Sequence, residues 1–327
     1  MALIPIDNVG ETGIVKDINP WQLPPNVWSE GNNIRAEHGA IQKSPGYLEV
    51  MATCPVEPYY ITNLEASGAN YWIVGGLEKI YVHDGSSWTD LTRASGGDYS
   101  ATAAENWTST VLGGVLVMSN GYDVPQFWGL SAGVPSTSTK MADLTNWQNS
   151  AYYPFSVKAF RSFLIALNVT KSGTGYTNLV KWSTEAATQT LPASWDEADA
   201  TVDAGEYSLE DSRGKILDGL PLGDAFMIYK EDSTYMMTYI GTPFIFQFRQ
   251  ISPNVGALTK NCVAEYDGGH FVFGNGDIYI NNGQRLQSLL PHKMRDHVFN
   301  NISGDDFQKS FVVADYGNTE MWACYVS

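Results

Sequence analysis

Short runs of β-branched and aromatic residues alternate with Gly, Asn and Asp pairs along most of the chain. One pattern, a strand, a turn and a second strand with an aromatic residue, recurs six times, at Trp72, Val115, Phe163, Ala225, Phe271 and Val312. Successive copies are 43, 48, 62, 46 and 41 residues apart. Because β-propeller blades repeat every ~40–50 residues, the pattern predicts an all-β fold, a six-bladed β-propeller.

Tight turns separate the paired strands in several copies. The pairs Asp84-Gly85, Asn120-Gly121, Asn275-Gly276 and Asn282-Gly283 are typical of two-residue hairpin loops, whose positive φ angles match the twist of the strands. Helix is scarce. Residues 293–300, in which Met294 and Val298 lie one turn apart after Pro291, predict one short helix.

The first 50 residues precede the repeats and differ from them in residue pattern. Prolines at 20, 24 and 25 favour an extended arm, so we assign residues 1–50 to an N-terminal arm and residues 51–327 to the propeller. The segment from Ile34 to Gln42 has the pattern of strand, Gly turn and strand, and the last repeat has only two strands before Ser327. Because a closed ring leaves no strand edge exposed, we expect residues 34–42 to complete the sixth blade beside residues 310–326.

The 62-residue step contains an insertion at about residues 186–215. The part from Leu191 to Ser212 is rich in carboxylates and has no cation before Arg213, and its apolar spacing fits neither helix nor strand. We therefore expect a long acidic loop between the third and fourth blades. Loops of this length often contact a partner.

The formal net charge is −16. Such a surface repels phosphate, which argues against sequence-specific recognition of DNA or RNA. The N-terminus lacks a basic region followed by a long apolar run, and no stretch reaches 18 apolar residues. We expect a protein that is made and kept in a cytoplasm and has no membrane partner.

The sequence contains no recognisable group of catalytic or metal-binding residues. Cys54, Cys262 and Cys324 are widely spaced and indicate neither a disulfide framework nor a zinc site. There is no G-x-S-x-G motif, and we interpret His83 beside Asp84 as a polar pair in a hairpin. We expect no catalytic residue, no metal site and no cofactor.

Partner contacts are expected in the irregular segments. Tryptophans with irregular, Pro-containing flanks are candidates to anchor a neighbouring subunit, namely Trp21, Trp28 and Trp128. The insertion adds further candidate partner-binding residues, Trp195, Asp196, Glu197, Asp199, Asp203 and Glu206.

The segment from Pro24 to Tyr47 resembles the opening of tail nozzle proteins of short-tailed bacteriophages, also called tail tube or DNA-stabilising proteins. The resemblance covers most of the chain. It continues through Lys181-Trp-Ser, Leu191-Pro-Ala-Ser-Trp-Asp, Ala204-Gly-Glu, Leu220-Pro-Leu-Gly-Asp, Tyr229-Lys-Glu-Asp-Ser-Thr-Tyr, Gly276-Asp-Ile-Tyr and Asn318-Thr-Glu-Met-Trp.

This resemblance implies a structural virion protein of a phage tail. Such proteins form a homohexameric ring below the portal and adaptor, retain packaged DNA and conduct it during ejection. The partners implied are the portal and adaptor proteins, tail fibres or a needle, and DNA that passes without sequence-specific binding. The family has no catalytic residues to transfer.

Two alternatives remain open. A carbohydrate-binding propeller that recognises a receptor would use exposed members of the ten tryptophans and eighteen tyrosines. A sialidase-like glycosidase would bind a carboxylate with three of the seven arginines. However, residues 84–88, Asp-Gly-Ser-Ser-Trp, lack the S-x-D-x-G-x-x-W spacing of the repeated turn in those enzymes.

Overall fold

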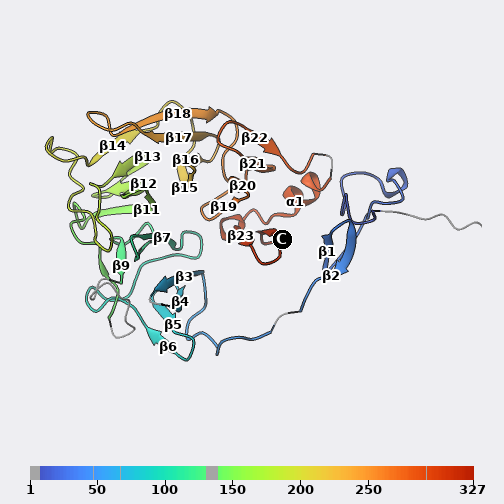
Figure 1. Ribbon diagram of the computed structural model, residues 1–327, viewed down its shortest axis with the longest axis horizontal. Coiled ribbons are helices and arrows are strands. Elements are labelled where there is room, and N and C mark those ends of the chain that lie inside the picture. Colours follow the sequence, from blue (N-terminus) through green and yellow to red (C-terminus); the bar gives the residue numbers. More distant parts are fainter. Residues whose placement is uncertain (1–7, 47, 67, 130–138, 292) are drawn as a thin grey trace, which may run out of the picture.

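The computed structural model describes residues 8–46, 48–66, 68–129, 139–291 and 293–327. Residues 1–7 and 47 of the expected arm lie outside this part. Five four-stranded antiparallel sheets follow one another around a common centre (Figure 1). The protein is therefore an all-β, five-bladed propeller, and the predicted number of six blades is wrong.

The blades are formed by consecutive strands. The first contains β3 (Tyr60–Ala66), β4 (Ala69–Gly75), β5 (Ile80–His83) and β6 (Trp88–Asp90). The second contains β7 (Thr108–Leu112), β8 (Val115–Ser119), β9 (Gln126–Trp128) and β10 (Ala142–Asp143). The third contains β11 (Tyr152–Phe160), β12 (Phe163–Lys171), β13 (Thr174–Trp182) and β14 (Gly205–Ser208). The fourth contains β15 (Ile216–Leu222), β16 (Ala225–Lys230), β17 (Thr234–Tyr239) and β18 (Phe246–Ser252). The fifth contains β19 (Val263–Tyr266), β20 (Gly269–Phe273), β21 (Ile278–Asn281) and β22 (Leu286–Ser288).

The sixth repeat forms only a hairpin, β23 (Phe311–Asp315) with β24 (Glu320–Cys324). The N-terminal strands β1 (Ile34–Glu37) and β2 (Ala40–Lys43) pair with each other and not with this hairpin. A hydrogen bond of 3.0 Å from Arg35 Nη1 to Asn318 Oδ1 joins the two hairpins. The expected completion of the sixth blade by residues 34–42 is therefore wrong, because β1 and β2 use each other as pairing partners.

Apolar side chains fill the space between successive blades. Leu64 and Leu116 contribute to the cluster between the first and second blades, and Val117 and Leu164 to that between the second and third. Phe163 and Phe226 pack between the third and fourth blades. Because alternate residues of a strand point to opposite faces, the fully buried strands β8 and β20 carry mostly apolar side chains on both faces.

Local sequence signals placed the turns and the helix at the right positions, but the prediction of two-residue loops is wrong, since residues 84–87, 274–277 and 282–285 form four-residue loops between their strands. Gly85 and Gly276 adopt φ angles of 94° and 90°, a region that glycine enters without steric cost. Helix α1 spans Arg295–Asn301, close to the predicted residues 293–300. Two single-turn 3-10 helices, η1 (Pro20–Gln22) and η2 (Phe307–Lys309), complete the secondary structure of the described residues.

The arm is attached to the start of α1. Both carboxylate oxygens of Asp17 accept hydrogen bonds of 3.0 Å, one from the backbone N–H of Asp296 and one from that of His297. Met294, at the N-cap position, provides no side-chain cap. Asp17 therefore supplies from the arm the cap that the helix sequence lacks.

Substituting Asp17→Ala is expected to lower the free energy of unfolding by about 1 kcal/mol, since two helix N–H groups lose their acceptor. The same change should release the arm, which limited proteolysis of residues 8–46 would detect. Asp17→Asn retains an acceptor oxygen and serves as the control. Equal cleavage of the arm in wild type and Asp17→Ala would contradict this attachment.

Candidate partner-binding groove

The acidic insertion folds back onto the third blade. Its residues 205–208 form β14, which pairs with β13 in the register Lys181↔Glu206 and Trp182↔Gly205. Gly205 lies against the indole of Trp182, and a Cβ atom at this position would be 2.5 Å from the ring. The insertion is thus partly the outer strand of a blade, where the sequence had predicted only a loop.

Trp195 fixes the middle of the insertion to the blade. Its side chain is 1% exposed and meets Trp147 edge to face, with ring centroids 4.7 Å apart. A buried aromatic pair of this kind stabilises the packing beyond its buried area. The expectation that Trp195 contacts a partner is therefore wrong for this chain, because the side chain belongs to the core.

Two glutamates of the insertion are neutralised by lysines of the blade. Lys181 is fully buried and forms ion pairs with Glu197 and with Glu206, the latter at 3.5 Å. Lys171 lies 2.5 Å from Glu206 and 3.7 Å from Glu197. Burial alone would raise the pKa of Glu197, but the hydrogen bond and the charge of Lys181 outweigh it and lower the pKa to about 2.

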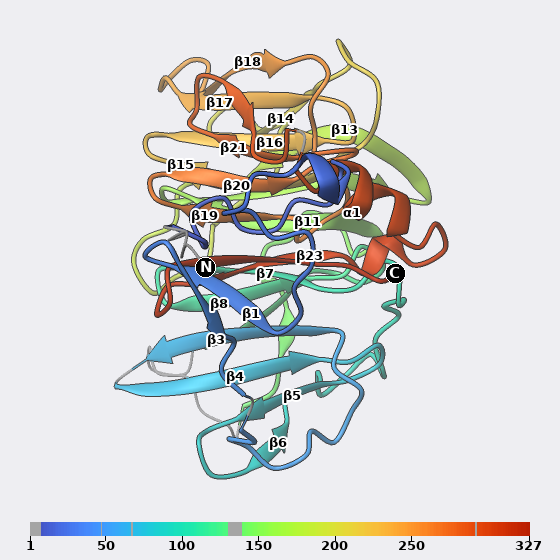
Figure 2. The ribbon, with the colours of Figure 1, turned by 90° about the vertical axis from the view of Figure 1, so that its right-hand side faces the viewer.

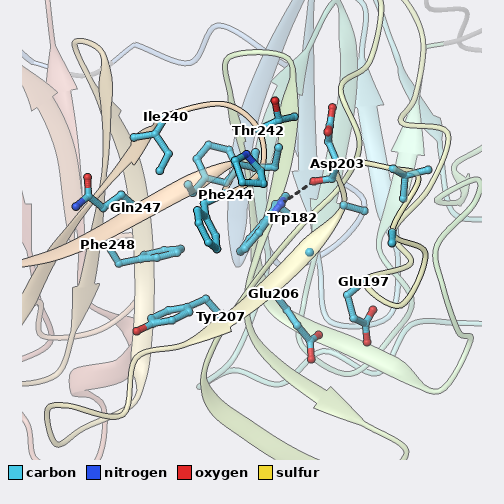
Figure 3. A pocket seen from close by; sticks show the side chains of 17 residues that line it. Trp182, Glu197, Asp203, Glu206, Tyr207, Ile240, Thr242, Phe244, Gln247 and Phe248 are labelled. Carbon is cyan, nitrogen blue, oxygen red and sulfur yellow. Dashed lines mark hydrogen bonds between the residues drawn. The ribbon is translucent and has the colours of Figure 1, made fainter.

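Beside these ion pairs, aromatic residues form a groove with a volume of about 1010 Å³ (Figure 3). Its walls come from the insertion and from the segment that leads from β17 into β18. Tyr207 and Phe248 stack with ring centroids 4.8 Å apart and an interplanar angle of 9°. Phe244 is 73% exposed, and the indole N–H of Trp182 donates to the Asp203 carbonyl over 2.8 Å.

The chemistry of the groove favours binding over proton transfer. Glu197 stays ionised at neutral pH, and its Oε2 accepts from both Lys181 and Gln148. A general acid needs a pKa near the working pH, which this carboxyl does not have. The flat aromatic faces next to fixed carboxylates instead suit a ligand or partner with apolar surface and hydrogen-bond donors.

Three of the nine predicted partner-binding residues line this groove, namely Glu197, Asp203 and Glu206. The others lie elsewhere. Asp196 accepts a 3.4 Å hydrogen bond from Gln148, and Asp199 is exposed and accepts from Thr201 in its own turn.

The three remaining tryptophans differ in exposure. Trp21 is 94% exposed and Trp28 is 42% exposed. Trp128 is 1% exposed and packs edge to face on Tyr71, with centroids 5.5 Å apart. The predicted partner contact of Trp128 is therefore wrong, because the residue ends β9 inside the cluster between the first two blades.

Sequence reasoning missed the aromatic part of the groove. Tyr207, Phe244 and Phe248 were assigned no role, although Phe244, Phe246 and Phe248 alternate along the segment after Gly241. Alternating aromatic residues next to a long insertion were the available signal. Their convergence with Tyr207 depends on the pairing of β14 with β13, which the local sequence does not show.

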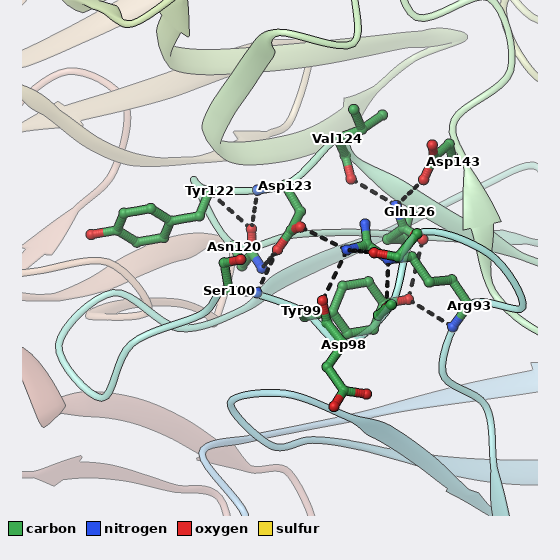
Figure 4. Close-up of polar contacts among 12 residues, drawn as sticks. Arg93, Asp98, Tyr99, Ser100, Asn120, Tyr122, Asp123, Val124, Gln126 and Asp143 are labelled. Atoms are coloured by element: carbon green, nitrogen blue, oxygen red, sulfur yellow. Dashed lines mark hydrogen bonds and ion pairs between the residues drawn. The ribbon is translucent and has the colours of Figure 1, made fainter.

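A second polar cluster links the first two blades (Figure 4). Arg93 Nη2 lies 3.0 Å from Asp123 Oδ1, and the backbone N–H of Ser100 donates to Asp123 Oδ2 over 2.8 Å. Tyr99 donates to Gln126, which in turn donates to Asp143 over 2.7 Å. Because its members satisfy one another, the cluster holds the loop after β6 against the second blade.

The polar residues considered for catalysis are also engaged locally. His83 Nδ1 accepts from the N–H of Gly85 over 3.1 Å, while the Asp84 carboxylate accepts from Ser86 and Ser87 in the same turn. Arg35, Arg93 and Arg161 form ion pairs with nearby carboxylates, and they lie on β1, after β6 and in the turn between β11 and β12.

Metal and membrane features were searched within the described residues. In that part of the chain, no three His, Cys, Asp or Glu side chains are grouped so that they would hold a metal ion. The same residues contain no helix with the length and apolar character needed to cross a membrane.

Comparison with known proteins gives distant structural similarity only. No known family matches the sequence, and no curated protein matches it. The extracellular domain of a putative hybrid two component system from B. thetaiotaomicron has a TM-score of 0.48 and 12% identity over 88% of this chain. The computationally designed Ika8 protein has a TM-score of 0.39 and 11% identity, covering 69% of this chain and 60% of its own.

A third match is PorZ of Porphyromonas gingivalis, a component of the type-IX secretion system, with a TM-score of 0.39 and 11% identity over 70% of this chain. The present chain spans 33% of the first matched structure and 27% of PorZ. At such similarities these proteins bear on neither the function nor the partners of this chain.

The substitution Glu197→Gln is expected to lower the free energy of unfolding at pH 7 by about 1 kcal/mol, the range of partly exposed ion pairs. The folded-state pKa of Glu197 is about 2, below its ordinary 4.5. The stabilisation by the carboxylate is therefore fully present above pH 4.5 and is lost as the pH falls towards 2.

Denaturant unfolding at several pH values measures this effect. The difference between wild type and Glu197→Gln should shrink from pH 4.5 downwards and vanish near pH 2. Glu185→Gln, which removes an exposed carboxylate just before the insertion, is the matched control and should cost little at any pH. A difference that does not change with pH would contradict the ion pair.

Proposed function

We propose that this protein is a structural component of the virion tail of a short-tailed bacteriophage. In this proposal six copies form a nozzle ring below the portal and adaptor, which retains packaged DNA and conducts it during ejection. The resemblance of residues 24–47 and of the later motifs supports it. The protein would be made in the host cytoplasm and assembled into the tail without acting as an enzyme.

The exposed apolar surface around the arm is the observation that carries the proposal. Trp21, Leu48 and Val50 are 94%, 85% and 80% exposed. The arm and the β1–β2 hairpin lie outside every blade, in front of β23 (Figure 2). Large apolar side chains that stay exposed on segments outside the blades are typical of surfaces that another subunit covers.

The charge of the chain suits a conduit for DNA. Six copies would carry a formal charge of −96, six times −16. A wall with the same sign as DNA has few contacts that hold phosphate, because binding to phosphate requires cations that release its counterions. Within a ring, the exposed carboxylates Asp196 and Asp199 would face either the channel or an adaptor or fibre protein.

Assembly is the first test. Light scattering after size exclusion should give a ring of ~215 kDa, six times the chain mass of 35.9 kDa, since closed cyclic assemblies are the usual form of such oligomers. Trp21→Ala should weaken assembly roughly 30-fold, the effect of removing an interface tryptophan, with the melting temperature of the subunit unchanged.

Tyr316→Ala removes another exposed aromatic residue, 73% exposed and in the turn after β23, and is the matched control. A stable monomer at all concentrations, or hydrolase activity in that monomer, would overturn the proposed ring.

The aromatic groove favours carbohydrate binding as a second candidate function. Sugars stack on flat aromatic faces and donate hydroxyl hydrogens to carboxylates, and the stacked Tyr207–Phe248 pair lies beside Glu206 (Figure 3). A receptor-recognising propeller would use this surface. Both functions are compatible with the same fold.

Glycan-array binding tests the second candidate. Tyr207→Ala should reduce the binding of any recognised glycan at least 10-fold, because the stacked platform is lost. Tyr176→Ala, which changes an exposed tyrosine of β13 outside the groove, should leave binding unchanged. Equal loss in both variants, or no glycan bound by wild type, would rule out the groove as a sugar site.

A further inference from the structure

A second cleft lies at the centre of the propeller, with a volume of about 610 Å³. Each of the five blades contributes its first strand, and β23 contributes as well, so residues from β3, β7, β11, β15, β19 and β23 line the cleft. We call it the axial cleft. Its size falls within the range of pockets that hold small organic ligands, ~300–1,000 Å³.

One end of the axial cleft is polar, and the carboxylate of Asp218 there already has ion-pair and hydrogen-bond partners. Asp218 lies 3.3 Å from Lys158 and accepts a hydrogen bond of 2.9 Å from Ser156. The backbone N–H of Asn261 donates to the second oxygen of Asp218 over 3.2 Å. Lys158 is thus paired directly with Asp218, which acts on Lys260 only as a charge outside ion-pair distance.

Lys260 also lines the cleft, but no carboxylate of the described residues lies within ion-pair distance of it. It is 2% exposed, and its ammonium group donates to the backbone carbonyl of Asn106. Its Nζ lies 4.3 Å from the ring centroid of Phe155. A buried cation without a counter-ion is unfavourable, so an anion at this position would be strongly stabilised.

A second polar group at the cleft is also unsatisfied. Ser310, which is 2% exposed and lines the cleft, has a buried side-chain oxygen that makes no hydrogen bond to any described residue. A buried hydroxyl without a partner costs free energy. Lys260 and Ser310 together offer one charge and one hydroxyl donor, the groups that a carboxylate binds.

Another part of the cleft lining is apolar and exposed to solvent. Ile61, Phe311 and Val313 line it and are 58%, 43% and 47% exposed. Ile61 lies on β3 of the first blade, and Phe311 and Val313 lie on β23 of the two-stranded sixth repeat. Exposed apolar side chains at the entrance of a cleft favour a ligand with a hydrocarbon part.

We propose that the axial cleft binds a small organic carboxylate, with the carboxylate group at Lys260 and Ser310 and the hydrocarbon part against Phe311, Val313 and Ile61. The site belongs to one subunit and is independent of the proposed ring. The net charge of −16 makes the remaining surface unattractive to anions, so binding is confined to this local positive group.

Straight-chain carboxylates from acetate to octanoate are the probes, with alcohols of equal length as controls. Calorimetry at pH 6.5 and physiological salt should show binding of the carboxylates only. Each added methylene should tighten binding about fourfold until the apolar wall is covered. Inorganic phosphate and chloride test for a site that accepts any anion, and equal binding of these ions would overturn the proposal.

Two variants separate the two ends of the site. Lys260→Met removes the charge but keeps the length of the side chain, and it should weaken carboxylate binding at least 10-fold. Phe311→Ala should remove the dependence on chain length while acetate binding stays unchanged. Lys43→Met, on the exposed strand β2, is the matched control. Wild-type affinity in Lys260→Met would contradict the proposal.

Proton uptake provides a test on the wild-type protein alone. Burial, the largest cause, and the charges of Lys158 and Lys215 lower the pKa of Lys260 to about 7, against the opposing effect of Glu105 and Asp218. Above pH 7 the amine must gain a proton when it binds a carboxylate, so affinity should fall as the pH rises from 6 to 8.5. Binding heats at pH 8 should depend on the ionisation enthalpy of the buffer, and heats without that dependence would refute the role of Lys260.

Discussion

Every sheet of the propeller has two faces, and each face must be covered by a neighbouring sheet. The clusters around Leu116, Leu164 and Phe226 meet this requirement between successive blades. It explains why most central strand positions are apolar on both faces. The polar residues that do lie on inner strands, such as Lys158 and Asp218, are paired with each other. Where the ring of blades is incomplete, at β23–β24, the requirement is not met, and apolar side chains such as Phe311 remain exposed.

The sequence predicts well what neighbouring residues determine. Hairpins, their turns and the helix at Arg295–Asn301 follow from local patterns. Features that depend on pairing between distant segments of the chain were not predicted. The strand Gly205–Ser208 forms because Lys181 attracts Glu206 and because Gly205 fits against Trp182. Trp195 was assigned to an exposed loop because its burial depends on Trp147, far away in the sequence.

The predicted number of blades was wrong for a related reason. Each hydrophobic repeat was counted as one blade, but a repeat with only two strands can form a blade only if two more strands join it. The hairpin β1–β2 has its own register, Ile34↔Lys43 to Glu37↔Ala40, and the arm before it is fixed at α1 by Asp17. The spacing of the hydrophobic repeats therefore predicts pairs of strands. Whether two such pairs join into one four-stranded blade depends on contacts between distant segments, which the repeats do not reveal.

Three of the four buried lysines in the described residues show three ways to accommodate a cation in a low-dielectric interior, and the fourth, Lys158, is paired with Asp218. Lys181 has two glutamates. Lys230 donates to the carbonyls of Leu209 and Ser212, at 2.9 and 2.8 Å, and to the hydroxyl of Ser212. Lys260 has one carbonyl and an aromatic face. Because the first two are satisfied within the fold, they stabilise it, whereas the third keeps binding capacity for a ligand. The groove at the outer strands and the axial cleft at the inner strands therefore differ in chemistry as well as in position.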